Sequence, residues 1–198
     1  MAPWRVLLPL TLAACTAAGR AKDDVVRPRL SLTGARAADY YPLAEGWSWT
    51  YALWEDGKKT QTRHAVLERQ GDVALVQEGD ERIAYAVSPE GIAEKDGERI
   101  GDYILKNPIE AGAEWPVAGG RARIATVDGR FEDPHLGRYE GCVLVAVTRA
   151  DPIRVTQTWF APYLGPYAIG IQAWDGTQYL TIAQARLISV TRPDAPAH

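Results

Sequence analysis

Cysteine and histidine are scarce in this sequence, with two cysteines and three histidines among 198 residues. Cys142 is the only cysteine besides Cys15, so the chain has no disulfide framework of the kind that stabilises small secreted domains. The histidines, His64, His135 and His198, lie far apart, and no carboxylate stands at metal-ligand spacing from them. We therefore expect no metal site, no cofactor and a buried, unreactive thiol at Cys142.

Motifs for nucleophilic catalysis are also missing. None of the four serines lies in a G-x-S-x-G turn, and no glycine-rich phosphate loop opens a helix. The formal charge of −3 is spread along the chain, so the sequence lacks the basic surface that nucleic-acid binding requires. These absences predict a non-enzymatic protein without catalytic residues or a nucleic-acid partner. The alternative is an enzyme with an unrecognised hydrolytic site, for which Ser48 and His64 are the residues to test.

A short apolar leader that ends in a cysteine is present at the start of the chain. Arg5 precedes the apolar stretch 6–12, which is far shorter than the roughly 20 residues that a membrane-spanning helix needs. The segment Leu12-Ala13-Ala14-Cys15 resembles the lipobox of bacterial lipoproteins, whose cysteine is lipidated and becomes the first residue of the mature protein. The resemblance implies a signal peptide at 1–14 and a Cys15 that carries a diacylglycerol and an amide-linked acyl chain such as palmitate. Two or more such chains hold a protein stably on a membrane.

The residues after the cysteine bear on location and tethering. Thr16 stands where an aspartate retains enteric lipoproteins in the inner membrane, so the resemblance implies the outer membrane, facing the periplasm. Residues 15–38 are polar and without periodicity, which predicts a flexible tether, and residues 193–198 predict a disordered tail. The alternative is an ordinary secretory signal cleaved near Ala18, which would discard Cys15.

Residues 39–192 have the size of one domain and show strand patterns almost throughout. In Trp47–Leu53, large apolar residues alternate with small or polar ones, as in a half-buried strand. Asp56-Gly57 follows, and this dipeptide between two strands is a hairpin signal. The same signal recurs at Asp96-Gly97, Asp128-Gly129 and Asp175-Gly176. We expect the remaining strands at residues 58–67, 72–78, 81–88, 92–95, 98–105, 121–127, 142–149, 153–160, 167–174 and 177–190.

Helical periodicity is weak in this domain, and a short helical turn is expected only near residues 43–46 or 103–106. Turn signals arrive every 8–12 residues along the chain. This spacing predicts an all-β fold, an antiparallel meander that forms a strongly curved sheet, half-barrel or sandwich with little helix.

Three segments resemble motifs of a group of β-rich bacterial envelope lipoproteins that have no established biochemical function. Tyr40–Tyr51 is similar to their YYPL-x-x-G-x-x-W-x-Y opening, and Gly137–Val143 is similar to their G-x-F/Y-x-x-C segment. Trp159–Pro166 resembles their Y-x-A-P-G-V-G segment, from which Tyr163 and Pro166 depart. The resemblance implies a curved antiparallel sheet, broadly like the half-barrels of periplasmic lipoprotein carriers, and it implies no catalytic residue.

Aromatic residues are the candidates for ligand binding. Trp47, Trp49 and Tyr51 share one face of a strand and, with Trp159, could form an aromatic surface for a glycan or an acyl chain. The alternative is that they form a packed core. Seven Trp and nine Tyr against two Phe suit a partly wet cavity, since the first two have polar tips. We expect a membrane-anchored lipoprotein that binds or scaffolds an apolar ligand or another envelope protein.

Overall fold

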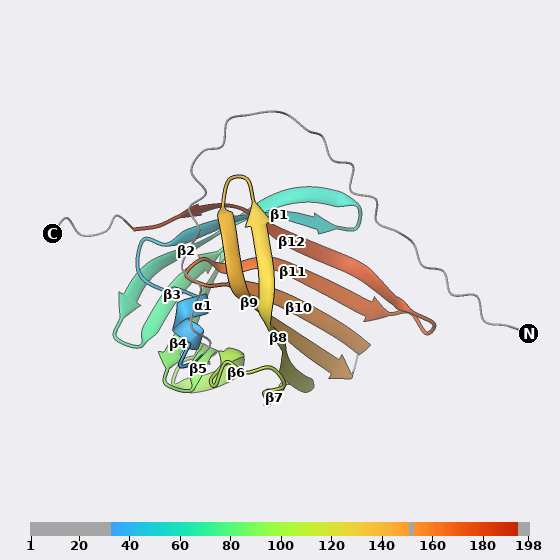
Figure 1. Ribbon diagram of the computed structural model, residues 1–198, viewed down its shortest axis with the longest axis horizontal. Coiled ribbons are helices and arrows are strands. Elements are labelled where there is room, and N and C mark those ends of the chain that lie inside the picture. Colours follow the sequence, from blue (N-terminus) through green and yellow to red (C-terminus); the bar gives the residue numbers. More distant parts are fainter. Residues whose placement is uncertain (1–32, 151–152, 194–198) are drawn as a thin grey trace, which may run out of the picture.

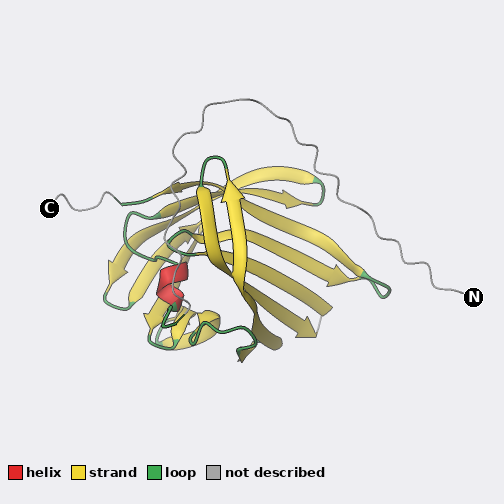
Figure 2. Ribbon diagram, in the orientation of Figure 1, coloured by secondary structure: helices red, strands yellow, loops and turns green. Residues whose placement is uncertain are grey.

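The computed structural model describes residues 33–150 and 153–193. In these ranges it contains twelve strands and one helix of four residues, which confirms the predicted all-β class (Figure 2). That helix is too short to span a membrane, and the described residues contain no other. The elements are α1 (Ala37–Tyr40), β1 (Ser48–Glu55), β2 (Lys58–Gln70), β3 (Val73–Glu78), β4 (Glu81–Ser88), β5 (Gly91–Asp96), β6 (Arg99–Lys106), β7 (Glu114–Val117), β8 (Gly120–Asp133), β9 (Gly137–Ala150), β10 (Ile153–Ala161), β11 (Gly165–Trp174) and β12 (Tyr179–Thr191).

All twelve strands form one antiparallel sheet with the order β6-β5-β4-β3-β2-β1-β12-β11-β10-β9-β8-β7 (Figure 1). Sequence neighbours pair everywhere except between β6 and β7, and β1 also pairs with β12. The first and last strands are therefore adjacent, and the sheet is interrupted between β6 and β7, in the middle of the sequence. The predicted meander is confirmed.

The two edge strands, β6 and β7, approach each other through side chains. The Trp115 Nε1–H donates to the Tyr103 carbonyl oxygen at 2.9 Å. The Ala118 N–H donates to the Asp102 carboxylate, also at 2.9 Å. The sheet is therefore so strongly curved that it nearly closes.

Two of the local predictions fail for identifiable reasons. Asp128-Gly129 is not a hairpin turn but lies inside β8, at a series of register shifts against β9. A Cβ at Gly129 would lie only 2.7 Å from Trp159 Cζ3, so the glycine permits a close approach rather than a turn. Residues 103–106 belong to β6 rather than to a helical turn, and residues 43–46 form a non-helical turn.

Two elements had no prediction. Helix α1 is one turn long, too short to show a periodicity. Strand β7 contains Pro116, which normally argues against a strand because proline cannot donate to the ladder. An edge strand tolerates it, and β7 is an edge of this sheet.

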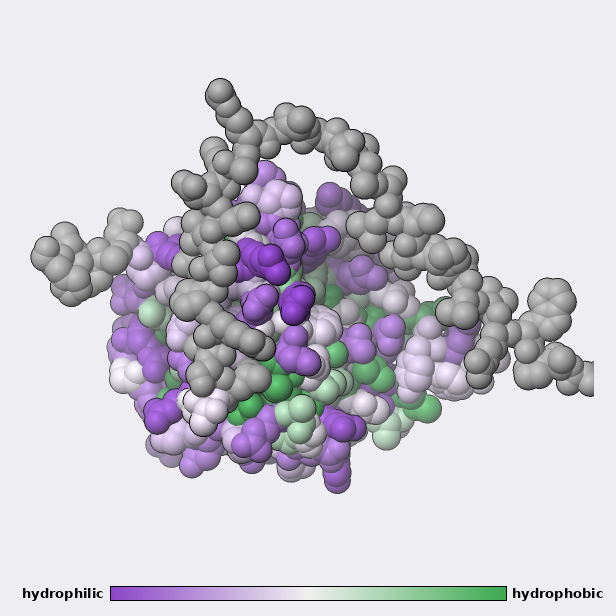
Figure 3. All heavy atoms as spheres, viewed as in Figure 1, coloured by the Kyte–Doolittle hydropathy of each residue, from purple (hydrophilic) through white to green (hydrophobic). Residues whose placement is uncertain are grey.

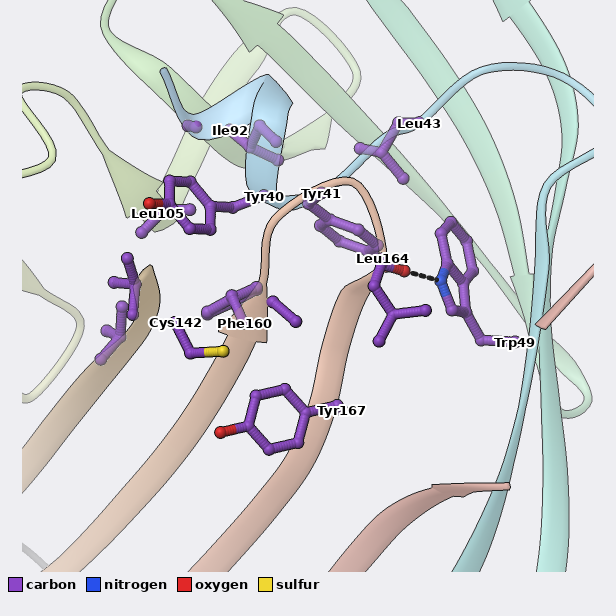
Figure 4. Packing of buried hydrophobic residues seen from close by; sticks show 14 of the residues in the cluster. Tyr40, Tyr41, Leu43, Trp49, Ile92, Leu105, Cys142, Phe160, Leu164 and Tyr167 are labelled. Carbon is purple, nitrogen blue, oxygen red and sulfur yellow. Dashed lines mark hydrogen bonds between the residues drawn. The ribbon is translucent and has the colours of Figure 1, made fainter. Parts of the chain in front are cut away.

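The core fills the inner side of the curve, where α1 also packs. Trp49 is fully buried, and its Nε1–H donates to the Leu164 carbonyl oxygen at 2.6 Å (Figure 4). The Tyr40 hydroxyl of α1 donates to the Gly141 carbonyl oxygen at 3.0 Å. Ala37, which precedes the strands, is buried as well. Other large, fully buried side chains are Tyr51, Ile92, Leu105, Ile124, Tyr139, Phe160 and Leu187.

The end of the β8–β9 hairpin bends over the opposite side of the sheet, where it crosses β10, β11 and β12 (Figure 1). Phe131 of β8 stacks on Tyr167 of β11, with ring centroids 4.1 Å apart. At the tip, the Asp133 carboxylate lies 3.8 Å from the Arg186 guanidinium of β12. These contacts leave a hollow beside the hairpin.

Candidate functional site

A groove of about 1000 Å³ lies on the side of the sheet that the β8–β9 hairpin crosses. Its floor comes from β10, β11 and β12, with Phe131 of β8 at one end and the β1–β2 turn at the other. The lining residues are Trp54, Glu55, Asp56, Gly57, Phe131, Gln157, Trp159, Tyr167, Ala168, Ile169, Gly170, Gln172, Leu180, Thr181, Ile182, Ala183, Gln184, Ala185 and Arg186.

A row of cross-strand partners crosses the floor of the groove. Trp54 pairs with Gln184, Gln184 with Gly170, and Gly170 with Gln157. Paired residues present their side chains on the same face of a sheet. Neighbouring strands are about 4.8 Å apart, so the row is roughly 14 Å long. It places one indole and two carboxamides on a single line.

A second row lies beside the first, toward the hairpin. Arg186 pairs with Ala168, and Ala168 pairs with Trp159. The Trp159 ring lies 6.3 Å from the Tyr167 ring. Trp159 is half-buried, because one side of its indole faces Gly129 of the hairpin. The packed hairpin thus positions this tryptophan.

The middle of the groove is open because of a glycine. A Cβ built at Gly170 has no heavy atom within 4 Å. Each of its two cross-strand partners, Gln157 and Gln184, carries a long flexible amide. The floor is therefore lowest at Gly170, with a polar side chain on each side.

The predicted aromatic residues divide between two sides of the sheet. Trp49 and Tyr51 are buried in the core, and the Tyr51 hydroxyl donates to the Pro166 carbonyl oxygen at 2.9 Å. Trp47 is half-buried and stacks on Trp49 at 5.8 Å. Trp159 alone among the four predicted residues lines the groove. The structure does not bring all four together.

The glutamines of the groove were not singled out from the sequence, and Trp54 was not grouped with the predicted aromatic face. Trp54 has the opposite parity to Trp47, Trp49 and Tyr51, and this places it on the other face of β1. That signal was available in the sequence. The glutamines come from three strands, and Gln172 follows a register shift between β11 and β12. A shift of this kind cannot be recognised from spacing alone.

The residues of the alternative hydrolytic site do not converge. Ser48 pairs with Ala65, and His64 pairs with Trp49, so the two side chains point to opposite faces of the sheet. The Ser48 hydroxyl accepts a hydrogen bond from Arg63 Nη2 at 3.1 Å. His64 Nδ1 lies 3.8 Å from Glu78 Oε2. Burial lowers the pKa of His64, while the Glu78 carboxylate opposes that shift.

Metal-binding and thiol chemistry are likewise unsupported in the described part of the chain. No group of three or more His, Cys, Asp or Glu side chains there could hold a metal ion. Cys142 is fully buried, and burial raises the pKa of its thiol to about 12. The thiol is therefore protonated at neutral pH. Cys15, the predicted lipidation site, lies outside the described residues.

Comparison with known proteins gives four structural matches, of which two distant ones are described below. No known family and no curated protein matches the sequence. A candidate exported protein with a YmcC-like fold from Bacteroides fragilis NCTC 9343 has a TM-score of 0.48 and 13% identity, over 77% of this chain and 99% of the other. A candidate lipoprotein from Parabacteroides distasonis ATCC 8503 has a TM-score of 0.40 and 12% identity, over 77% and 98% of the two chains. Likeness at this level assigns neither a family nor a function.

Proposed function

We propose that this protein is a lipid-anchored, non-enzymatic binding module of the cell envelope that holds its ligand in the groove. The observation that carries the proposal is the groove of about 1000 Å³ beside the β8–β9 hairpin. Ligand sites are generally concave, about 300–1000 Å³ in volume, and lined by aromatic residues with a few placed polar groups. The lipobox resemblance at Cys15 supports the anchor and the location.

A second, smaller cavity is a weaker candidate for a ligand site than the groove. It has a volume of about 220 Å³ and is lined mainly by aliphatic residues. That volume is below the usual range for small-molecule sites. Its lining residues are Leu53, Trp54, Glu55, Ile169, Ile171, Ala183, Gln184 and Ala185.

The divergence of Ser48 and His64 supports a non-enzymatic role. A nucleophile and its base must lie within hydrogen-bond reach of each other, and these two point away from each other.

Scaffolding of another envelope protein remains the second role to test. The end of the sheet formed by β10–β12 exposes several large apolar residues, and Figure 3 shows hydrophobic residues toward that side. They are Ile153, Trp174, Tyr179, Leu180 and Ile182.

The anchor is tested by a pair of cysteine variants in the native host. Cys15→Ala should move the protein from the membrane fraction to the soluble fraction and abolish labelling with palmitate. Cys142→Ala is the matched control and should stay in the membrane, because its thiol is buried in the described domain. Membrane association of Cys15→Ala, or a mature protein that starts downstream without fatty acid, contradicts the anchor.

The binding role is tested by native mass spectrometry of the full chain extracted from its host membrane. A small molecule retained by the wild type, and lost when Gly170→Val raises the middle of the groove floor, is the expected result. A defined protein partner with an unoccupied groove would instead favour scaffolding.

A further inference from the structure

We infer that the groove binds a neutral glycan segment rather than an acyl chain. The inference rests on the proposed binding role and names the class of ligand. Its basis is the combination of side chains in the groove: two indoles, three carboxamides and a bare glycine floor, namely Trp54, Trp159, Gln157, Gln172, Gln184 and Gly170.

The three glutamines match the hydrogen-bonding character of sugars. Each carboxamide has two donor hydrogens and an acceptor oxygen. A sugar hydroxyl both donates and accepts, so it can pair with either end of an amide. Gln157, Gln172 and Gln184 come from β10, β11 and β12, and each lines the groove. Three adjacent strands therefore each present an amide that can both donate and accept hydrogen bonds.

The two tryptophans offer flat surfaces at separate points of the groove. The electron-rich face of an indole attracts the partly positive C–H groups of a sugar ring. Trp54 is 37% exposed, and Lys59 Nζ lies 5.2 Å from its ring centroid. Trp159 lies across the floor and is held by the packed hairpin. The row between β1 and β10 spans roughly 14 Å, which is longer than a single monosaccharide.

The same lining disfavours a fatty acid. An acyl chain laid along the floor would cover the amides of Gln157 and Gln184 without forming hydrogen bonds to them, and each unpaired amide weakens binding by about tenfold or more.

The charged residues of the groove favour a neutral ligand. Arg186, the arginine of the lining, already faces Asp133 at 3.8 Å. At the other end, the carboxylates of Glu55 and Asp56 outnumber the Lys59 ammonium that lies over Trp54, so this end does not favour an anion.

Isothermal titration of the full lipidated chain, in a detergent without sugar groups, tests the inference. The probes are neutral linear hexasaccharides, namely an α-glucan, a β-glucan, a mannan and a galactan, with palmitate as the competing probe. At least one hexasaccharide should bind, and palmitate should not displace it. Trp54→Ala should weaken that binding at least tenfold, because an indole face is lost.

Gly170→Val supplies the second arm. Valine suits a strand, and its side chain enters open space, so the fold should be retained while the middle of the groove floor is raised. Binding should fall at least tenfold. The matched controls are Trp174→Ala, with a similarly exposed indole outside the groove, and Gln61→Ala. Both should keep the wild-type affinity within twofold, and thermal unfolding should show every variant to be folded.

The outcomes separate the ligand class from the binding role. Failure of all four hexasaccharides to bind, or binding that Gly170→Val leaves unchanged, overturns the glycan inference. Palmitate binding that Gly170→Val abolishes also overturns it, while the groove survives as the binding site. If a ligand that copurifies with the protein is unaffected by Gly170→Val, the proposed binding role in the groove fails as well.

Discussion

Two glycines near the groove show how differently one added carbon can act. A Cβ at Gly129 would lie 2.7 Å from Trp159 Cζ3 and 3.0 Å from the Cys142 carbonyl oxygen. A Cβ at Gly170 would meet no heavy atom within 4 Å. The first glycine allows the hairpin to pack against the indole, and the second keeps the groove open.

This contrast predicts opposite effects on stability. Gly129→Ala should lower the free energy of unfolding by about 1–3 kcal/mol, because the Trp159 ring and the backbone of β9 must shift. Gly170→Ala should leave stability unchanged or raise it by up to about 1 kcal/mol, since alanine restricts the unfolded chain. Urea denaturation of both variants measures the difference. Equal effects would mean that Gly129 is not in tight contact with Trp159.

At the scale of elements, the bent end of the β8–β9 hairpin shapes the groove. It is attached by the stack of Phe131 on Tyr167 and by hydrogen bonds and charges farther along. Arg192 Nη2 donates to the Tyr139 hydroxyl at 3.3 Å, and Asp133 faces Arg186. The ion pair contributes little, because its arginine is exposed, so the aromatic stack is expected to dominate.

Loss of that stack should loosen this hairpin end. Phe131→Ala should lower the free energy of unfolding by about 3–5 kcal/mol. It should also speed amide hydrogen exchange in residues 128–140, while exchange in β3 and β4 stays close to that of the wild type. Mass spectrometry of peptic peptides follows both regions. Arg186→Ala is the comparison variant, and it should change exchange at the hairpin tip only slightly. A uniform increase over the whole sheet would contradict local attachment.

At the scale of the whole molecule, the sheet is continuous except between β6 and β7. Strand β12 pairs with both β1 and β11, so it joins the two halves of the sequence. The connection over residues 107–113 belongs to no strand, although its Ile109 is buried and its Gly112 and Ala113 hydrogen-bond to Ile124 of β8 through their backbones. A break between residues 107 and 111 therefore cuts no strand of the sheet, whereas a break in β12 interrupts the ladder that joins the two halves.

A nick in the middle of the chain should consequently leave the protein folded. A protease recognition sequence inserted between Glu110 and Ala111, both exposed, is expected to be cleaved. The two fragments should then remain together during gel filtration with an unchanged circular dichroism spectrum. A matched insertion between Gln184 and Ala185, within β12, should abolish folding. Separation of the fragments after the middle nick would mean that the β1–β12 ladder does not hold the halves together.

Much of the fold was predictable from local pattern. Alternation in Trp47–Leu53 indicated β1, and Asp56-Gly57 indicated its hairpin, where both residues adopt positive φ. Asp128-Gly129 carried the same local signal but lies in a strand, where the close approach of Trp159 leaves no room for a Cβ at Gly129. Strand β7 was not predicted because it contains Pro116. A strand tolerates proline at the edge of a sheet, and only the strand order shows that β7 is an edge.

By itself, the sequence determined the all-β class, the meander and the turns that follow from residues with positive φ. It also placed an aromatic stripe on β1, because side chains alternate along any strand. Tertiary structure alone decided that β12 closes onto β1 and that the β8–β9 hairpin bends back over the sheet. It also decided that the glutamines of three strands meet Trp54 and Trp159 in one groove. Cross-strand register and bulges determine which residues of different strands lie side by side, and neither can be read from the spacing of residues along one strand.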